Sequence, residues 1–144
     1  MLLENDKMVE IRVRDIAQQI GAALEYLHSN GIMLRNLDAQ GILMSQTDIE
    51  YNLQDAIPKI GRLGCSIITG YNHLSKGIFG DIRFRAPEVL QNKHYDFRAD
   101  SWSFGVIIFL MLTGRFPFDD YEYTNIPITS GAKLEDYPER ILVS

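Results

Sequence analysis

Cysteine is almost absent from this sequence. Cys65 is the single cysteine among 144 residues, so no disulfide can form within the chain. This usage is typical of a reducing compartment, and we expect an intracellular, cytoplasmic location. Cys65 itself follows a glycine, and we interpret it as a small packing residue.

Basic runs are absent as well, and the net charge of −5 argues against nucleic acid or an anionic membrane as a partner. Met1 is followed by two leucines and then by acids, without a basic segment or a long apolar core, so we expect no secretory signal. There is no repeat or low-complexity segment. The length predicts one domain, and the hydrophobic fraction of 46% suffices for a core.

Long apolar runs are missing too. The run Val106–Leu112 is far shorter than the roughly 20 residues of a membrane span. Within Asp100–Thr113 it predicts a helix that is apolar on every side and therefore buried at the centre of the fold. A strand is the alternative, because Val, Ile and Phe favour sheets. Asp100 or Ser101 could cap the start, and a glycine after Thr113 could end the helix.

The stretch Val9–Asn30 predicts an amphipathic helix. Its apolar positions recur every three or four residues, at Ile16, Ile20, Ala23 or Leu24, and Leu27. We expect Asn30 and the glycine after it to end the helix. His28, in the last turn, is interpreted as a packing histidine or a cation at the helix terminus rather than as a ligand.

Shorter elements are expected in the rest of the chain. The segments Ile32–Ser45 and Ile57–Ser66 predict short strands beside polar loops, Gln46–Ala56 a hairpin tip, Ile67–Ile82 a long irregular loop, Arg83–Gln91 a short helix that begins near a proline, and Lys133–Val143 a weak helix. His73 and His94 are expected at the surface, and Phe116 and Phe118 as core anchors.

Several motifs occur in an order typical of one family. They are YLHSNGI at Tyr26–Ile32, RAPEVL at Arg85–Leu90, DSWSFG at Asp100–Gly105 and RFPF at Arg115–Phe118. With them, the segment Val9–Phe118 resembles the C-terminal lobe of a protein kinase. The resemblance implies a mainly α, partial kinase C-lobe with a buried central helix and short β-hairpins near the catalytic-loop region. It implies one domain over residues 1–144, without the small lobe and the last helices.

The resemblance also implies which positions belong to the family's structural motifs. These are Arg35, Gly64, Ala86, Pro87, Glu88, Asp100, Trp102 and Gly105. Asp100 is then expected to hold the backbone of the catalytic loop, and Glu88 to face solvent. Arg35 is expected to hydrogen-bond loop backbone. The alternative is that it pairs with a phosphorylated residue of the following loop, among Ser66, Thr69, Ser75 and Tyr71.

The catalytic positions of the family carry other residues here. The HRD motif corresponds to Leu34–Asn36, so Asn36 stands where the family has its general base. The magnesium-binding Asn corresponds to Gly41, and the Asp of DFG corresponds to Arg62. The loop lysine of many Ser/Thr kinases corresponds to Asp38.

These changes bear directly on chemistry. An amide cannot take a proton from a hydroxyl, and a lost general base costs typically 10²–10⁴-fold in rate. Gly41 offers no side-chain oxygen. Arg62 replaces an attraction for magnesium with repulsion, on the scale of about 4 kcal/mol per unit charge pair at ~4 Å and an effective dielectric of ~20. We therefore expect no catalytic activity, no metal and no cofactor, although intact family members use ATP and magnesium.

The favoured hypothesis is thus a catalytically inactive, pseudokinase-like domain that acts as a protein-interaction or structural module. Two alternatives stay open. One is a divergent kinase fragment with ATP binding and Ser/Thr phosphotransfer, and the other is a metal-independent nucleotide-binding regulator in which Arg62 contacts phosphate. A protein partner, or a missing kinase lobe, is expected to cover exposed apolar faces.

The two charge reversals suggest one more contact. Relative to the family, Asp38 turns a positive position negative and Arg62 turns a negative one positive. One hypothesis is that these two residues, or Arg62 with another acid nearby, form an ion pair that fills the family's metal position. The favoured alternative is that both side chains face solvent.

Overall fold

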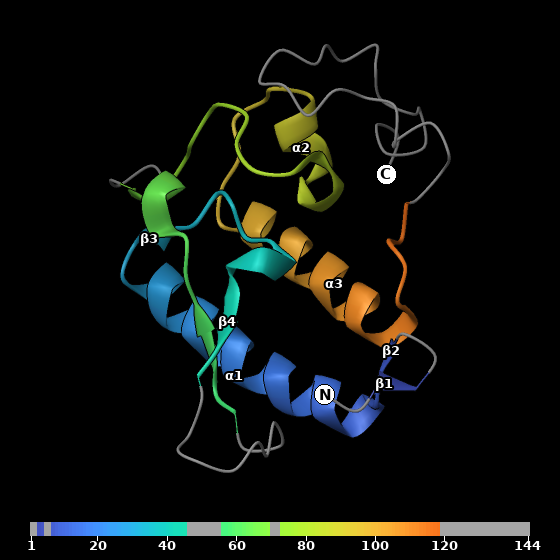
Figure 1. The fold of residues 1–144 in the computed structure, drawn as a ribbon. Helices are drawn as coiled ribbons and strands as arrows, with labels where there is room; N and C mark the ends of the chain where they lie inside the picture. Colours follow the sequence, from blue (N-terminus) through green and yellow to red (C-terminus); the bar gives the residue numbers. More distant parts are fainter. Residues whose placement is uncertain (1–2, 5–6, 46–55, 70–72, 119–144) are drawn as a thin grey trace.

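The structure, a computed structural model, describes residues 3–4, 7–45, 56–69 and 73–118 (Figure 1). The helices of this part are α1 (Glu10–Ser29), α2 (Pro87–Leu90) and α3 (Arg98–Thr113), and the strands are β1 (Leu3–Glu4), β2 (Lys7–Met8), β3 (Ile32–Met33), β4 (Ile42–Met44), β5 (Pro58–Ile60) and β6 (Ile67–Ile68). Single 3-10 turns cover Ala39–Gly41, Leu63–Cys65 and Ile82–Phe84. This combination of helices with small antiparallel strand pairs agrees with the expected mainly α fold that carries short hairpins.

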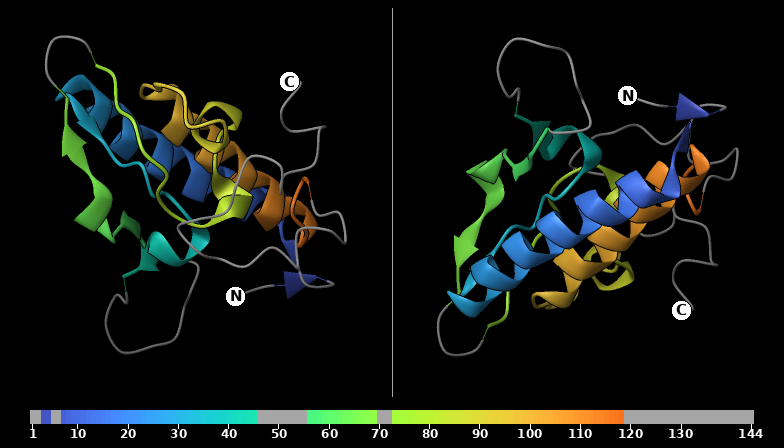
Figure 2. Two further views of the ribbon diagram at one scale, coloured as in Figure 1. Left: turned by 90° about the horizontal axis from the view of Figure 1, so that it is seen from above. Right: turned by 90° about the horizontal axis from the view of Figure 1, so that it is seen from below.

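Helix α1 confirms the amphipathic prediction. Its buried residues are Val13, Ile16, Ile20 and Leu24, spaced by three or four along one face. That face lies against α3, β3 and β5, and the views of Figure 2 show α1 and α3 side by side along most of their lengths. The apolar stripe is therefore what holds the two long helices together.

Helix α3 differs from the prediction in its burial. The strand alternative is excluded, but the buried residues, Ala99, Asp100, Ser103, Val106 and Ile107, form one face. On the opposite side Ser101 and Gly105 are exposed, and Phe109 is 41% exposed. The expectation of burial on every side is therefore wrong for the described residues. An apolar composition makes burial favourable, yet the neighbouring segments decide how much of the helix is covered.

The start and the end of α3 test two further expectations, of which one is wrong and one is confirmed. The helix begins at Arg98 after Phe97, without a side-chain cap, so capping by Asp100 or Ser101 is wrong. The carboxylate of Asp100 points to another segment instead. Gly114 ends the helix in the left-handed conformation, with φ of 70°, and its N–H bonds Leu110 O at 2.8 Å. That stop was predicted.

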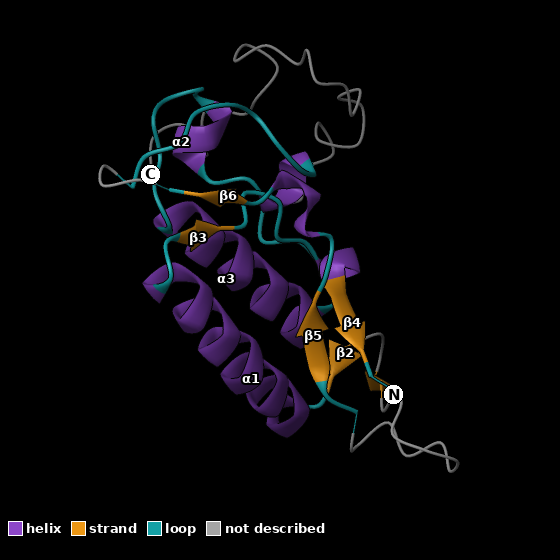
Figure 3. Cartoon of the chain, turned by 90° about the vertical axis from the view of Figure 1, so that its left-hand side faces the viewer, coloured by secondary structure: helices purple, strands orange, loops and turns teal. Residues whose placement is uncertain are grey.

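The strands form pairs rather than one sheet. β4 pairs with β5 and β3 with β6, both antiparallel. Figure 3 shows β3 and β6 near the C-terminal end of α1 and β4 and β5 nearer its N-terminal half, where Arg12 Nη2 donates to Ala56 O at 2.9 Å. The β1–β2 pair, with Leu3 opposite Met8, was not anticipated, because the first residues were interpreted as a polar lead. Most of the expected hairpin tip and the weak helix at Lys133–Val143 lie outside the described residues.

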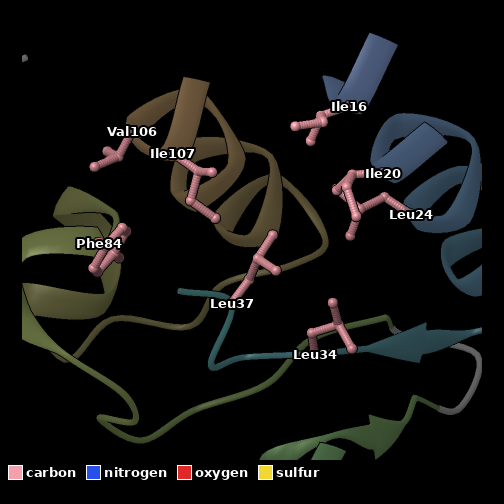
Figure 4. Packing of buried hydrophobic residues seen from close by; sticks show 8 residues of the cluster. All are labelled: Ile16, Ile20, Leu24, Leu34, Leu37, Phe84, Val106 and Ile107. Carbon is pink, nitrogen blue, oxygen red and sulfur yellow. The ribbon is translucent and has the colours of Figure 1, made fainter. Parts of the chain in front are cut away.

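The main core joins the loop after β3 to both long helices. Its buried members are Ile16, Ile20, Leu24, Leu34, Leu37, Phe84, Val106 and Ile107, which converge in Figure 4. A second cluster contains Met33, Ala86, Val89, Tyr95 and Ala99. Leu34 and Leu37 belong to the loop itself, so the loop is fixed by the same core that fixes the helices. Among the described residues, no helix combines the length and the apolar character that crossing a membrane requires.

Candidate functional site

The backbone of the loop that follows β3 is fixed by one buried carboxylate. Asp100, 1% exposed, accepts hydrogen bonds from Leu34 N to Oδ2 and from Arg35 N to Oδ1, both at 2.8 Å. Because a buried carboxylate without partners would be strongly unfavourable, these N–H groups both satisfy it and fix the loop. The expectation that Asp100 holds the loop backbone is confirmed.

His28 completes the set of partners of Asp100. Its Nε2 lies 3.0 Å from Asp100 Oδ2, and its ring packs 4.8 Å from the ring of Phe97. The packing interpretation of His28 is thus confirmed, but its bond to a carboxylate 72 residues away was not predicted. Helical periodicity places a residue on a face of its helix and carries no information about which distant side chain meets it.

Arg35 links the loop after β3 to the segment that contains Cys65, Ser75 and Phe79. Its Nε donates to Cys65 O at 2.6 Å, its Nη1 lies 3.3 Å from Ser75 Oγ, and its guanidinium lies 4.1 Å from the centre of the Phe79 ring. The expectation that Arg35 hydrogen-bonds loop backbone is confirmed. Its backbone is left-handed, with φ of 64°, a conformation that persists in a non-glycine residue when surrounding contacts impose it.

Asn36 follows Arg35 and faces a cavity. Its Oδ1 is buried and has no hydrogen-bond partner in the described part of the chain. Gly80 lies directly against this atom, because a Cβ on Gly80 would stand 2.3 Å from Asn36 Oδ1. Only a residue without a side chain fits there. A buried acceptor without a partner is costly, and a group that donates a hydrogen bond to Asn36 would relieve that cost.

Asp38 and Arg62 form an ion pair, so the structure supports that hypothesis over the favoured alternative in which both side chains face solvent. Asp38 Oδ1 accepts Gly41 N at 2.7 Å, which fixes the carboxylate at the start of the Ala39–Gly41 turn. Arg62 Nη1 lies 3.0 Å from Asp38 Oδ2 and 3.3 Å from Oδ1, and it also reaches Gln40 Oε1 at 3.3 Å. The Asp38 side chain is 7% exposed and that of Arg62 48% exposed, so the pair joins a buried acid to a half-exposed base.

The backbone around Arg62 aims its side chain at the loop. Gly61 N donates to Gly41 O at 2.8 Å, which ties the end of β5 to the end of the 3-10 turn. Arg62 itself is left-handed, with φ of 56° and ψ of 45°, ahead of the Leu63–Cys65 turn. A non-glycine residue in this conformation costs of order 1–3 kcal/mol, so the contacts of Arg62 must outweigh that strain.

Asn36 and Arg62 line the same open hollow, of about 360 Å³. The other polar side chains in its wall are Asp38, Gln40, Asp81 and Arg83. Asp81 and Arg83 form a second acid–base pair, in which Arg83 N donates to Asp81 Oδ1 at 3.0 Å. Burial would raise the pKa of the Asp81 carboxyl, but hydrogen bonds from the Arg83 side chain and N–H outweigh it and hold this pKa below its ordinary value.

Asp81 and Arg83 were not predicted as site residues. Asp81 lies in the expected irregular loop and Arg83 begins the expected short helix, and nothing in their spacing indicates the hollow. An Asp two residues before an Arg is a signal for a local pair, because its carboxylate can accept a hydrogen bond from the N–H of the residue two positions later. The same Asp-x-Arg pattern recurs at Asp96 and Arg98, outside the hollow.

Other predicted positions support the scaffold. Ala86 is 1% exposed, Pro87 begins α2, and Trp102 stacks on Phe118 with ring centres 5.5 Å apart. Phe116 meets Phe84 edge-on at 5.3 Å, as expected of an aromatic anchor. Glu88 was expected to face solvent and is instead partly buried, because α2 packs against the second core cluster.

The remaining positions sit at or near the surface. Gly64 and Gly105 are exposed, and so are His73 and His94, as expected. Cys65 is a free, partly buried thiol whose carbonyl is used by Arg35. Tyr71 lies outside the described residues, and of the other three residues considered for phosphorylation Ser75 already contacts Arg35.

Magnesium, which the kinase resemblance implies, does not fit this donor set. Mg²⁺ takes octahedral oxygen ligands, and the Asp38 carboxylate here is already engaged by a guanidinium and a backbone N–H. Arg62 places a positive charge beside it. In the described part of the chain, no group of three His, Cys, Asp or Glu side chains could hold a metal ion. We therefore derive no chemical step through a metal.

Comparison with known proteins identifies the family. The protein kinase domain model matches residues 1–137. Over 110 residues, 76% of this chain, the sequence is 37% identical to human serine/threonine-protein kinase ULK1, of which this covers 10%. Over 125 residues, 87% of this chain, it is 34% identical to the SNF1-related protein kinase catalytic subunit alpha KIN12 of Arabidopsis thaliana, of which this covers 24%.

A third relative agrees, and the comparison corrects one expectation. Protein kinase kin1 of Schizosaccharomyces pombe is 29% identical over 142 residues, which is 95% of this chain and 15% of that protein. The chain thus spans between a tenth and a quarter of the length of these relatives. The expectation that the protein is not an enzyme is wrong, because its relatives are named protein kinases and the matching domain is that of an enzyme family. The chain belongs to the protein kinase domain family.

Proposed function

We propose that this chain is the large-lobe part of a divergent serine/threonine protein kinase, which binds ATP and transfers its terminal phosphate to protein hydroxyl groups. The observation that carries the proposal is the loop itself. Asp100 and the core hold residues 34–41 so that Asn36 and Arg62 face one hollow. The order of the sequence motifs supports the large-lobe assignment, and the names of the relatives support the reaction.

The residues of the hollow define how such a reaction would proceed. Phosphoryl transfer has a loose transition state, so positioning and charge stabilisation supply most of the catalysis. Arg62 offers a fixed positive charge for the phosphate oxygens. Asn36 lines the hollow with its Oδ1 buried in the wall, so its side chain has to turn outward before that oxygen can orient the attacking hydroxyl. Because an amide does not take the proton of the attacking hydroxyl, that proton passes to a phosphate oxygen or to water as the O–P bond forms and ADP leaves. We therefore expect turnover slower by about 10²–10⁴-fold than with a carboxylate at this position.

A direct assay tests this proposal. The full natural protein that contains this chain would be incubated with ATP labelled at the terminal phosphate and with a serine- and threonine-containing peptide mixture. We expect slow labelling of hydroxyl side chains that falls in Arg62→Gln and persists in Arg98→Gln, whose arginine lies outside the hollow. Protein that binds ATP and leaves every acceptor unlabelled would overturn the proposal.

The Arg62–Asp38 pair favours a second candidate, a nucleotide-binding regulator that needs no metal. Arginine is a good phosphate partner, and here it stands beside a loop without a metal site in the described residues. A thermal-shift experiment with ATP separates the two candidates. Stabilisation by ATP together with turnover supports the kinase, whereas stabilisation by ATP in EDTA without turnover supports the regulator.

A protein partner and a cytoplasmic location stay predictions. Exposed apolar side chains such as Ile68, 78% exposed, and Ile11, 59% exposed, are the surfaces that a further lobe or a partner would cover. Cross-linking of the natural protein in cell extract, followed by mapping of the linked peptides, tests this expectation. Links confined to distant surfaces would contradict it.

A further inference from the structure

We propose that Arg62 is a metal-independent binding site for the terminal phosphate of a nucleotide. The inference deepens the proposed function, and it rests on that function for the identity of the ligand as a nucleotide. Its physical content is that a protein cation, held in place by Asp38, takes the role that a divalent ion has elsewhere in the family. Four features of the hollow support it.

The first feature is a free edge on the guanidinium. All three hydrogen bonds that Arg62 makes within the described residues use Nη1, toward Asp38 and Gln40. The N–H groups on Nε and Nη2 have no partner there. These two nitrogens form the side fork of an arginine, and a fork of this geometry binds two oxygens of one phosphate group.

The second feature is that the fork is held in advance. Asp38 is fixed by Gly41 N at 2.7 Å, and Asp38 in turn fixes Arg62 Nη1 at 3.0 Å. A guanidinium that is already positioned loses less conformational freedom when a ligand arrives, which raises affinity. The left-handed backbone of Arg62 directs its side chain to this place, and the contacts with Asp38 and Gln40 offset the strain of that conformation.

The third feature is exposure. The Arg62 side chain is 48% exposed, whereas Asp38 is buried on its other side. An incoming phosphate therefore meets the cation before it meets the carboxylate. Because Asp38 already uses Nη1, the phosphate does not need to break the ion pair in order to bind the free fork.

The fourth feature is the surrounding hollow. Its volume of about 360 Å³ leaves room for more than one phosphate group beside Arg62. The other acid in its wall, Asp81, is neutralised by Arg83, so it does not repel a phosphate group. A chain of phosphates that continues into a nucleoside fits this lining better than a divalent cation does, because the carboxylate of Asp38 is already paired with Arg62.

Calorimetric titration of the full natural protein tests the inference. ATP would be titrated in EDTA and again in magnesium, with wild type, Arg62→Gln, Arg62→Asp and Arg98→Gln. Arg98 is the matched control, since it also pairs with an aspartate but is 87% exposed and outside the hollow. Inorganic phosphate and tripolyphosphate serve as further probes, and labelling of the Arg62 Nε–H group in NMR reports where they bind.

We expect wild type to bind ATP in EDTA at least as tightly as in magnesium. Arg62→Gln should weaken binding about 10–100-fold, which corresponds to the loss of a charge-assisted contact. Arg98→Gln should stay within about 2-fold of wild type. Arg62→Asp, which creates two neighbouring carboxylates, should make binding depend on magnesium. ATP should bind more tightly than inorganic phosphate if the ligand is a nucleotide, and equal affinities would reassign the fork to phosphate alone and overturn the proposal.

Three further results would overturn the inference: ATP binding that requires magnesium in wild type, Arg62→Gln with unchanged affinity, or no binding under either condition. The phosphotransfer assay on the same preparations separates its failure from that of the proposed function. Labelling that needs magnesium in wild type leaves the kinase standing without the inference. Binding in EDTA without labelling leaves the inference standing without the kinase.

Discussion

Asp100, in α3, and Asp38, in the loop after β3, are two buried carboxylates that fix different parts of that loop and have different roles. Asp100 is 1% exposed, and its partners are two backbone N–H groups and His28. Asp38 also accepts a backbone N–H, but its other partner, Arg62, is half exposed and keeps a free edge. A carboxylate whose partners are all internal serves the scaffold, whereas one that positions an exposed cation can serve a ligand.

Asp100→Ala should produce the largest loss of stability. It leaves Leu34 N and Arg35 N buried without an acceptor and removes the partner of His28. We expect the free energy of unfolding to fall by about 3–4 kcal/mol. Urea denaturation followed by circular dichroism measures it. Asp96→Ala, at a more exposed pair, is the control and should cost well under 1 kcal/mol. If Asp100→Ala cost as little as this control, the contrast between Asp100 and Asp38 would disappear.

Asp38→Ala should cost less, about 1–2 kcal/mol, because it removes one capping bond and one half-exposed ion pair. Asp38→Asn sharpens the comparison, since its amide oxygen still accepts Gly41 N while the charge is lost. We expect Asp38→Asn to lie between wild type and Asp38→Ala in the same urea experiment. Equal losses for both variants would mean that the charge, not the cap, is what stabilises this end of the loop.

Arg62→Gln should change stability less again, by about 1 kcal/mol or less, since the pair is half exposed and screened by salt. Its effect on ATP affinity should be much larger than its effect on unfolding. Measuring both in low and in high salt separates ligand binding from structure. A loss of stability as large as that of Asp100→Ala would place Arg62 in the scaffold instead.

The smallest expected effect is a pH dependence at Asp81. The pKa of its carboxyl is lowered from 3.8 in the folded state, where the Arg83 contacts outweigh burial. A depressed pKa in the folded state contributes stability above the unfolded pKa, and that contribution disappears as the pH falls below 3.8 and through the folded pKa. Urea midpoints of wild type should therefore decline over this interval more steeply than those of Asp81→Asn. Parallel curves would show that the pair contributes nothing to folding.

Local pattern predicted the elements that depend on neighbouring residues. The three- and four-residue spacing of α1 fixes its buried face, and Gly114 ends α3 because it can adopt a positive φ. The Arg62–Asp38 pair could be raised as a hypothesis from the sequence, but only because motif order placed the two residues at adjoining positions, and the solvent-facing alternative was favoured. The β1–β2 pair was missed, since two-residue strands carry too little alternation to be recognised.

The sequence by itself determined α1, the end of α3, the kinase-like order of motifs and the two reversed charges. Each of these depends on residues that are close together in the chain or belong to one motif. Only the tertiary structure decided that α3 keeps an exposed side, that His28 meets Asp100, and that Asp81 and Arg83 line the hollow beside Arg62. Those contacts join segments tens of residues apart, and their distances are set by how the whole core packs, which no local pattern encodes.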